Sequence, residues 1–200
     1  MTQLLFIRWL PAQSDLFNIV IQSGAVLAVL PLFPDRLKQV CFGWREKATQ
    51  DFIVKIGVAF MITGAGGFLL EENGFTLPDT VGPIAGALLV GGILFLIVER
   101  WLADRPMTGG ITWTIAIGVG LGQLIAAIFP GASRSGTTIL VALLLGLSRP
   151  AATEFSFLVG IPTMLAAGGY KIVKALTGPG SGVGAEDWGM VLLGFFVSAG

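Results

Sequence analysis

The chain has 200 residues, of which 54% are hydrophobic and only 12% are charged, a composition outside the range of water-soluble domains. Lys and Arg equal Asp and Glu at 12 each, so bulk charge does not recruit nucleic acid. The sequence has no histidine and a single cysteine, Cys41, which excludes histidine chemistry, an internal disulfide and a zinc cluster within these residues.

Apolar runs follow one another along the chain, and several approach the ~20 residues that a spanning helix needs. They cover about residues 16–33, 52–70, 83–98, 111–129, 137–147, 155–170 and 188 onward. The run 137–147 is too short to cross a bilayer, and the glycine- and serine-containing segment 130–136 joins it to the preceding run. We therefore predict an all-α polytopic membrane protein in which 111–147 forms a re-entrant hairpin. Because non-helical backbone at membrane depth needs protein or a water-filled cavity around it, this hairpin is the candidate site.

The charges of the first two long loops predict on which side of the membrane each loop lies. The first loop contains Arg36, Lys38, Arg45 and Lys47, whereas the second contains Glu71, Glu72 and Asp79 without any Lys or Arg. By the positive-inside rule, we expect the first loop to be cytoplasmic. Lys171 and Lys174 fall on the opposite side under this assignment and argue against it.

A weak internal repeat supports an inverted topology. Residues 17–28 resemble residues 155–166, and the two helices would cross the membrane in opposite directions, as inverted repeats require. We divide the single membrane domain, 1–200, into a first repeat with a connecting span, 1–110, and a second repeat, 111–200. The same alignment places the counterpart of 123–138 before Met1, and the run from Trp188 reaches only Gly200. We therefore expect both repeats to be incomplete, with a first hairpin upstream and further helices downstream.

Arg134 is the residue of the hairpin best suited to bind a ligand. It is a permanent cation among apolar segments, where an unpaired charge costs at least ~2.5 kcal/mol. The neighbouring hydroxyl and glycine residues are Ser133, Ser135, Gly136, Thr137 and Thr138, and the following helix begins with free backbone N–H donors. A guanidinium binds phosphate oxygens in a fork, and a hydroxyl adds a donor or a nucleophile. The pattern indicates a phosphate cradle; the alternative is that the small residues pack helices while Arg134 reaches an interface or pairs with a distant carboxylate.

Polar residues on either side of the cradle have two interpretations each. Gln123 could orient water or a phosphate oxygen, or it could bond another helix. Glu154, which follows Arg149 and Pro150, is either a first-turn carboxylate of the next helix or the partner of Arg134. Near the ends of apolar runs, we interpret Trp101, Trp113 and Trp188 as interfacial anchors.

Three segments carry a family resemblance. The nine residues 130–138 (PGASRSGTT), followed by Ser148-Arg149 and 154–158 (EFSFL), resemble the undecaprenyl-pyrophosphate phosphatases of the bacitracin-resistance type, and 17–29 resemble that family's first full span. The resemblance implies two inverted repeats with re-entrant hairpins in the bacterial inner membrane, and a site open to the periplasm. It implies hydrolysis of undecaprenyl pyrophosphate to the monophosphate, which recycles the lipid carrier for peptidoglycan synthesis and confers bacitracin resistance.

The resemblance also assigns residues. Ser133 and Arg134 would contact the diphosphate, with Ser133 a candidate nucleophile and metal-bound water the alternative, and Thr138 would lie at the base of the pocket. The remaining substrate-binding candidates are Gly131, Ser135, Gly136, Thr137 and Gln123. Mg²⁺ or Ca²⁺ would support the reaction, but the family's glutamate-rich motif and histidine would lie before Met1, with Gln3 nearest the histidine position. We therefore predict no metal ligands in this sequence and low activity of the chain by itself.

The expected partners are a polyprenyl pyrophosphate lipid and the bilayer, without nucleic acid, and the sequence leaves open whether two chains form a homodimer. A membrane transporter or lipid-phosphate flippase is the alternative function, since inverted repeats with broken helices also build transporters. A third hypothesis is a structural remnant without catalysis.

Overall fold

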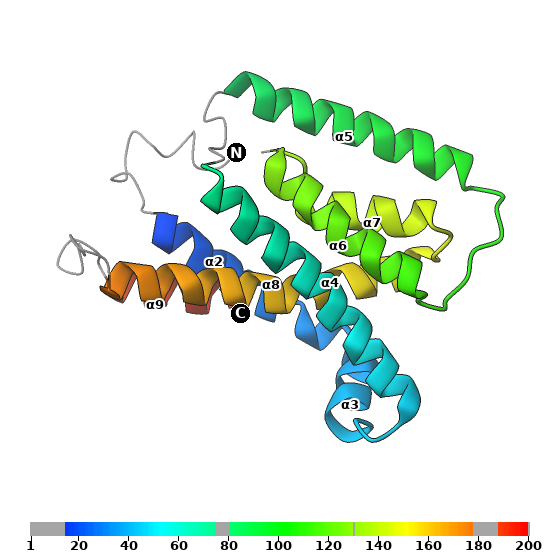
Figure 1. Cartoon of the computed structure of the whole chain (residues 1–200), viewed down its shortest axis with the longest axis horizontal. Coiled ribbons are helices and arrows are strands. Elements are labelled where there is room, and N and C mark those ends of the chain that lie inside the picture. Colours follow the sequence, from blue (N-terminus) through cyan, green and yellow to red (C-terminus); the bar gives the residue numbers. More distant parts are fainter. Residues whose placement is uncertain (1–14, 75–80, 130, 178–187, 200) are drawn as a thin grey trace. The chain divides into compact units, whose positions relative to one another are not determined.

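The computed structural model describes residues 15–74, 81–129, 131–177 and 188–199, and within these ranges every regular element is a helix (Figure 1). The elements are α2 (Asp15–Leu27), the short 3-10 helix η1 (Leu30–Leu32), α3 (Pro34–Phe42), α4 (Lys47–Glu72), α5 (Val81–Trp101), α6 (Trp113–Ile128), α7 (Arg134–Leu144), α8 (Arg149–Thr177) and α9 (Trp188–Ala199). Among the described residues, three stretches are long and apolar enough to cross a membrane: Lys47–Glu72, Gly82–Trp101 and Arg149–Tyr170. The predicted all-α polytopic membrane fold is confirmed.

The boundaries of two predicted segments were wrong. The apolar run 16–33 is not one helix, because α2 ends at Leu27 and the chain continues through η1 with Pro31 and Pro34, which lack the N–H that a helix interior needs. The first long loop is not a loop throughout, since Pro34 starts α3 at the position where a helix tolerates proline.

The chain divides into two compact units, residues 1–32 with 164–200 and residues 33–163. In the first unit, α2 packs on α9, where Val20 and Val191 are buried together. Gly24 permits this contact, because a Cβ there would lie 2.6 Å from the carbonyl oxygen of Phe195. The Ser198 hydroxyl donates to the Ile21 carbonyl at 2.9 Å and ties the same two helices together.

In the second unit, α4 and α6 pack closely against each other. A Cβ at Gly120 would lie 2.9 Å from the carbonyl oxygen of Ala59, and Ala59 is completely buried. The Thr63 hydroxyl lies 2.9 Å from the same Ala59 oxygen and 3.3 Å from the Gly120 carbonyl. Small residues and an interhelical hydroxyl are the usual means of packing helices in a bilayer, so this seam fits a membrane interior.

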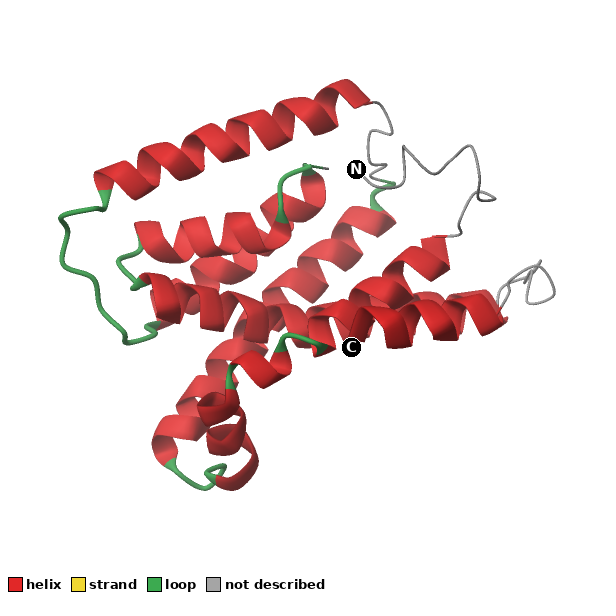
Figure 2. Ribbon diagram, turned by 180° about the vertical axis from the view of Figure 1, so that it is seen from behind, coloured by secondary structure: helices red, strands yellow, loops and turns green. Residues whose placement is uncertain are grey.

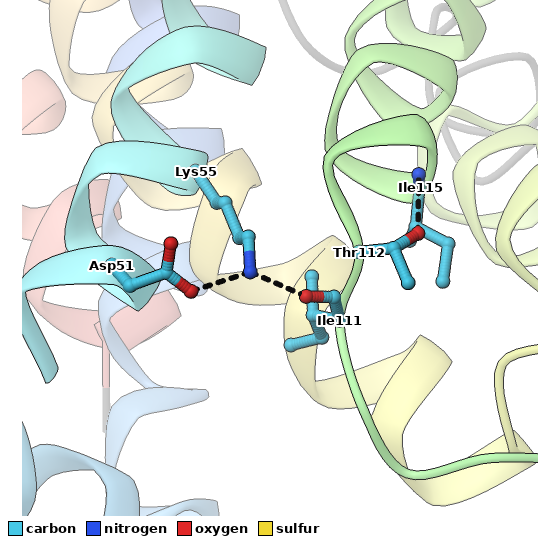
Figure 3. Close-up of polar contacts among 5 residues, drawn as sticks. All are labelled: Asp51, Lys55, Ile111, Thr112 and Ile115. Atoms are coloured by element: carbon cyan, nitrogen blue, oxygen red, sulfur yellow. Dashed lines mark hydrogen bonds and ion pairs between the residues drawn. The ribbon is translucent and has the colours of Figure 1, made fainter. Parts of the chain in front are cut away.

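A buried lysine fixes the start of α6 (Figure 3). Lys55 of α4 is only 8% exposed, and its ammonium group donates to the Asp51 carboxylate and, at 2.6 Å, to the Ile111 carbonyl. One residue later, the Thr112 hydroxyl accepts from the Ile115 N–H at 3.3 Å and caps α6. The charge of Lys55 is therefore compensated by the Asp51 carboxylate, beside the point where the loop ends and α6 begins.

The predicted hairpin is present as α6 and α7, and its two ends meet. The Thr108 N–H donates to the Gly146 carbonyl at 3.0 Å, and the Ser148 N–H donates to the Thr108 carbonyl at 2.7 Å. The green loop before α6 and the turn after α7 accordingly lie side by side when seen from behind (Figure 2). At ~1.5 Å per residue, the 11 residues of α7 rise ~16 Å, about half of a ~30 Å hydrocarbon core. Helix α7 is therefore too short to cross a bilayer by itself.

Ion pairs bring the basic loops to one end of the second unit. Arg149 at the start of α8 donates to Glu99 near the end of α5, with Nη2 and Oε2 2.6 Å apart, and Arg36 of α3 donates to Glu154 of α8. The Arg105 guanidinium stacks 3.7 Å from the centroid of Trp101 near the same end. This clustering agrees with the predicted common side of these loops. The Lys171 and Lys174 side chains, which argued against it, lie outside the described residues, as do Asp79 and the side chain of Trp188.

Candidate functional site

The site forms where α6 ends and α7 begins. Gly131 has φ +100, a backbone conformation that L side chains rarely adopt, and a Cβ there would overlap the Ile84 carbonyl oxygen and lie 3.0 Å from the Ile84 Cα. The Ala132 N–H donates to the Phe129 carbonyl at 3.0 Å and closes the turn. Glycine at 131 thus lets the loop lie directly against the start of α5; its neighbour Pro130 lies outside the described residues.

Ser133 caps α7. Its Oγ accepts from the Gly136 N–H at 3.2 Å and lies 3.4 Å from the Ser135 Oγ, while its carbonyl accepts from the Thr137 N–H. The Ser133 side chain is exposed, and its hydroxyl hydrogen is not required by the cap. The N–H groups of Arg134 and Ser135 belong to the first turn, so the helix offers them no carbonyl. The helix start therefore presents hydroxyl and amide donors together, as phosphate sites at helix starts do.

Arg134 is the first residue of α7 and differs from the other buried cations. Within the described residues, its Nη1 is buried without a hydrogen-bond partner, whereas Arg36 and Lys55 have carboxylate partners. A permanent cation near the middle of a bilayer costs ~2.5 to 3.5 kcal/mol on insertion scales. An anion at this helix start would compensate that cost. The interpretation that Arg134 pairs with a distant carboxylate finds no support among the described residues.

Thr138 lies one turn behind Arg134 and is almost fully buried. Its hydroxyl donates back into the helix, with the Arg134 carbonyl at 3.0 Å and the Ser135 carbonyl at 3.1 Å. Its hydroxyl hydrogen is therefore engaged, and the residue braces the first turn that carries Arg134 and Ser135. A direct contact of Thr138 with substrate stays a prediction.

Gln123 lies on α6 with 1% exposure, and neither its Oε1 nor its Nε2 has a hydrogen-bond partner among the described residues. A Cβ at the adjacent Gly122 would lie 3.7 Å from the Thr137 carbonyl, which sets Gln123 about one turn along the hairpin from Arg134. A buried polar group without a partner costs ~1–3 kcal/mol. The amide is thus available to a ligand or to water, and bonding to another described helix is not observed.

Glu154 does not support Arg134. It accepts a hydrogen bond from Arg36 Nε, and Arg36 also lies over the Phe52 ring at 4.5 Å. Nor is Glu154 a first-turn carboxylate, because α8 begins at Arg149 and its first turn contains no acid. The two interpretations were therefore wrong for different reasons: α8 begins five residues before Glu154, and a cation 118 residues earlier in the chain pairs with it.

Ser156 is a candidate that was not predicted from the sequence. This α8 residue is 5% exposed, and its hydroxyl has no partner in the described part of the chain. It lies inside the EFSFL segment that carried the family resemblance, and that was the signal available. Among the described residues of the second unit, buried polar atoms of Gln123, Arg134 and Ser156, and the hydroxyl of Thr49 on α4, therefore have no hydrogen-bond partner.

The fold and this site define an integral membrane protein with a candidate anion-binding hairpin. The chain belongs to the family described as bacitracin resistance protein BacA, whose family model matches residues 1–200. It is 50% identical over 192 residues to an undecaprenyl-diphosphatase of Rhizobium etli, covering 96% of this chain and 72% of that protein. An undecaprenyl-diphosphatase of Xanthomonas axonopodis pv. citri is 45% identical over 189 residues, or 94% of this chain and 71% of that protein. The predicted family is confirmed.

Proposed function

We propose that this chain is a membrane phosphatase that hydrolyses undecaprenyl pyrophosphate to undecaprenyl phosphate and inorganic phosphate. Membership of the BacA family and relatives that are undecaprenyl-diphosphatases support this activity over the transporter or flippase alternative. The structural observation that carries the proposal is the Arg134 guanidinium, whose Nη1 is buried and has no partner among the described residues. A polyprenyl pyrophosphate brings both the anion that this group needs and an apolar chain that the bilayer accepts.

In the proposed reaction, an oxygen nucleophile attacks the terminal phosphorus and the bond from that phosphorus to the bridging oxygen breaks. The bridging oxygen leaves with undecaprenyl phosphate. Arg134 and the first N–H groups of α7 stabilise the charge that develops on the transferred phosphoryl group, which is usually the largest catalytic contribution. The support is geometric: a guanidinium and free helix-start donors occupy one turn.

Two nucleophiles fit this scheme. In the first, Ser133 Oγ attacks, its proton is removed, and water later hydrolyses the phosphoserine. In the second, water attacks directly and Ser133 donates a hydrogen bond. Ser133 is exposed and its hydroxyl hydrogen is not used by the helix cap, which suits either role. Trapping of radiolabelled phosphate on the wild-type chain but not on Ser133→Ala would select the first scheme.

The family resemblance brings Mg²⁺ or Ca²⁺ into the proposal. Among the described residues, no three His, Cys, Asp or Glu side chains lie together in a group that could hold an ion. These residues do not fit a metal site, so the steps above use none. Gln3, the position nearest the family's histidine, lies outside the described residues.

We place the enzyme in the bacterial inner membrane, with the site reached from the periplasm. The support is that both ends of the hairpin, at Thr108 and Ser148, lie at the end that gathers Arg36, Arg105 and Arg149. If that basic end is cytoplasmic, the hairpin tip is approached from the opposite side. Labelling of a Ser133→Cys variant by a membrane-impermeant thiol reagent in spheroplasts, but not in inverted vesicles, is the expected result; the Cys41 background is removed by Cys41→Ser.

Phosphate release from undecaprenyl pyrophosphate in detergent with Mg²⁺ tests the activity and the site together. Arg134→Ala should lower the rate by at least ~100-fold, the loss typical when one donor to a developing oxyanion is removed. Arg105→Ala is the matched control, because it removes an arginine that stacks on exposed Trp101 instead of facing the hairpin. Full activity of Arg134→Ala would refute the site. Because the chain by itself is expected to have low activity, the assay is repeated on a version extended upstream of Met1, and absence of phosphate release from both would count against the function.

A further inference from the structure

Helix α3 is held in a fixed orientation although none of its residues is fully buried. Its inner face carries Arg36, which donates to Glu154 and, through Nη1, to the Gln39 amide oxygen at 2.8 Å. Val40 on the same face packs against the core of the second unit. Because α3 is anchored by this ion pair and by apolar contact, the face that it turns outward is defined.

That outer face and the turn that follows α3 are apolar and aromatic. Phe42 is 86% exposed, Trp44 56% and Leu37 39%, and Cys41 is exposed between them. The membrane-spanning helix α4 begins at Lys47, three residues after Trp44. Tryptophan at the end of a span and a short amphipathic helix beside it are both typical of residues that lie at the level of lipid headgroups.

Cations surround the same surface. Lys38, Arg45 and Lys47 are exposed and have no ion-pair partner within the described part of the chain, and the Arg45 guanidinium lies 5.1 Å from the centroid of the Trp44 ring. Two exposed acids, Asp35 and Glu46, offset part of this charge, whereas Arg36 is already neutralised by Glu154. The free charge that remains is positive, and basic residues directly beside a span attract anionic lipid headgroups.

We propose that α3 and the following turn, residues 34–47, form a binding surface for anionic phospholipid headgroups. The exposed Leu37, Phe42 and Trp44 side chains insert among the upper acyl chains and headgroups. Lys38, Arg45 and Lys47 contact the lipid phosphates. This surface involves none of the residues of the Arg134 site. A negative result for lipid binding would therefore leave the proposed phosphatase activity untouched, and the reverse also holds.

Quenching of Trp44 fluorescence by brominated lipids tests this surface. The full chain is reconstituted in bilayers of phosphatidylcholine and phosphatidylglycerol, and only one of the two lipids carries bromine in each sample. The Trp44 signal is obtained as the difference between the wild-type chain and Trp44→Phe. At equal mole fraction, we expect brominated phosphatidylglycerol to quench Trp44 at least about twofold more than brominated phosphatidylcholine, because the cations enrich anionic lipid near them.

Variants that remove the positive charges show whether these charges cause the preference for anionic lipid. The triple variant Lys38→Gln/Arg45→Gln/Lys47→Gln should reduce the quenching ratio to about one, and 0.5 M salt should reduce it in the wild type, as expected for exposed charges. Lys38→Gln/Lys47→Gln keeps the Arg45–Trp44 stacking and should give an intermediate ratio. Arg105→Gln, which removes the equivalent arginine stacked on Trp101, should leave the Trp44 ratio unchanged. Equal quenching by both lipids in the wild type would refute anionic selectivity, and absence of quenching by either would show that protein, a second copy included, covers the surface.

Discussion

Replacement of Gly131 by alanine tests whether the loop before α7 is held against α5 as described. Gly131 combines φ +100 with a position where a Cβ would overlap the Ile84 carbonyl oxygen. The backbone conformation alone costs a non-glycine residue ~1–2 kcal/mol. Overlap with a helix backbone, which unlike the end of a flexible side chain does not yield, adds ~1–3 kcal/mol.

Gly146 supplies the matched control. It also has positive φ, at +88, but no atom lies within 4 Å of the point that a Cβ would occupy there. Gly146→Ala should therefore lose only the ~1–2 kcal/mol of backbone strain, whereas Gly131→Ala should lose ~2–5 kcal/mol. Apparent melting temperatures in detergent, monitored by tryptophan fluorescence, would rank the two variants against the wild type.

Activity provides the second measurement. Because Gly131 precedes Ser133 and Arg134 by two and three residues, a displaced loop should also lower phosphate release. Gly146→Ala, at the far end of the hairpin, should retain most of the wild-type rate. If the two variants melt at the same temperature and release phosphate equally, the close approach of Gly131 to α5 is not a determinant of the site.

Two further predictions concern buried polar groups. Gln123→Leu removes an amide without a partner among the described residues, so the unliganded protein should be unchanged or up to ~2 kcal/mol more stable, while phosphate release falls. A destabilised but fully active variant would instead assign Gln123 to packing. At the start of α6, Asp51→Asn should destabilise more than Lys55→Met, because the former leaves a nearly buried ammonium without its counter-charge and the latter removes that charge. Melting curves of the two variants, compared with Asp51→Asn/Lys55→Met, would show similar, small losses of stability if the pair were simply a surface ion pair.

The features that could be predicted from the sequence are those with a local cause. Long apolar runs indicated the spanning helices, and a run too short to cross, placed after Gly131 to Gly136, indicated the hairpin and Arg134. The helix start also predicted the donor groups around Ser133, since capping depends only on neighbouring residues.

The features that sequence analysis missed depend on residues far apart in the chain. Glu154 pairs with Arg36 across 118 positions, and Lys55 reaches the Ile111 carbonyl across 56, so no local pattern distinguishes either from an ordinary charge at a helix end. Thr138 illustrates a different limit. Its place in the motif predicted a position at the base of the pocket, which stays a prediction, but not that its hydroxyl donates to carbonyls three and four residues earlier, because that depends on the side-chain rotamer.

The backbone bridge at the base of the hairpin has a consequence for synthesis on the ribosome. Thr108 bonds to Gly146 and Ser148, so the hairpin is complete only after the residues up to 148 have been made. At ~5–20 residues per second, the roughly 40 residues after Thr108 take about 2–8 s to translate. Arg134 is made before the last 14 of these residues, so for about 0.7–3 s it and its neighbouring hydroxyls have no closed hairpin around them. The insertion machinery must therefore shelter this polar tip from lipid until the second arm arrives.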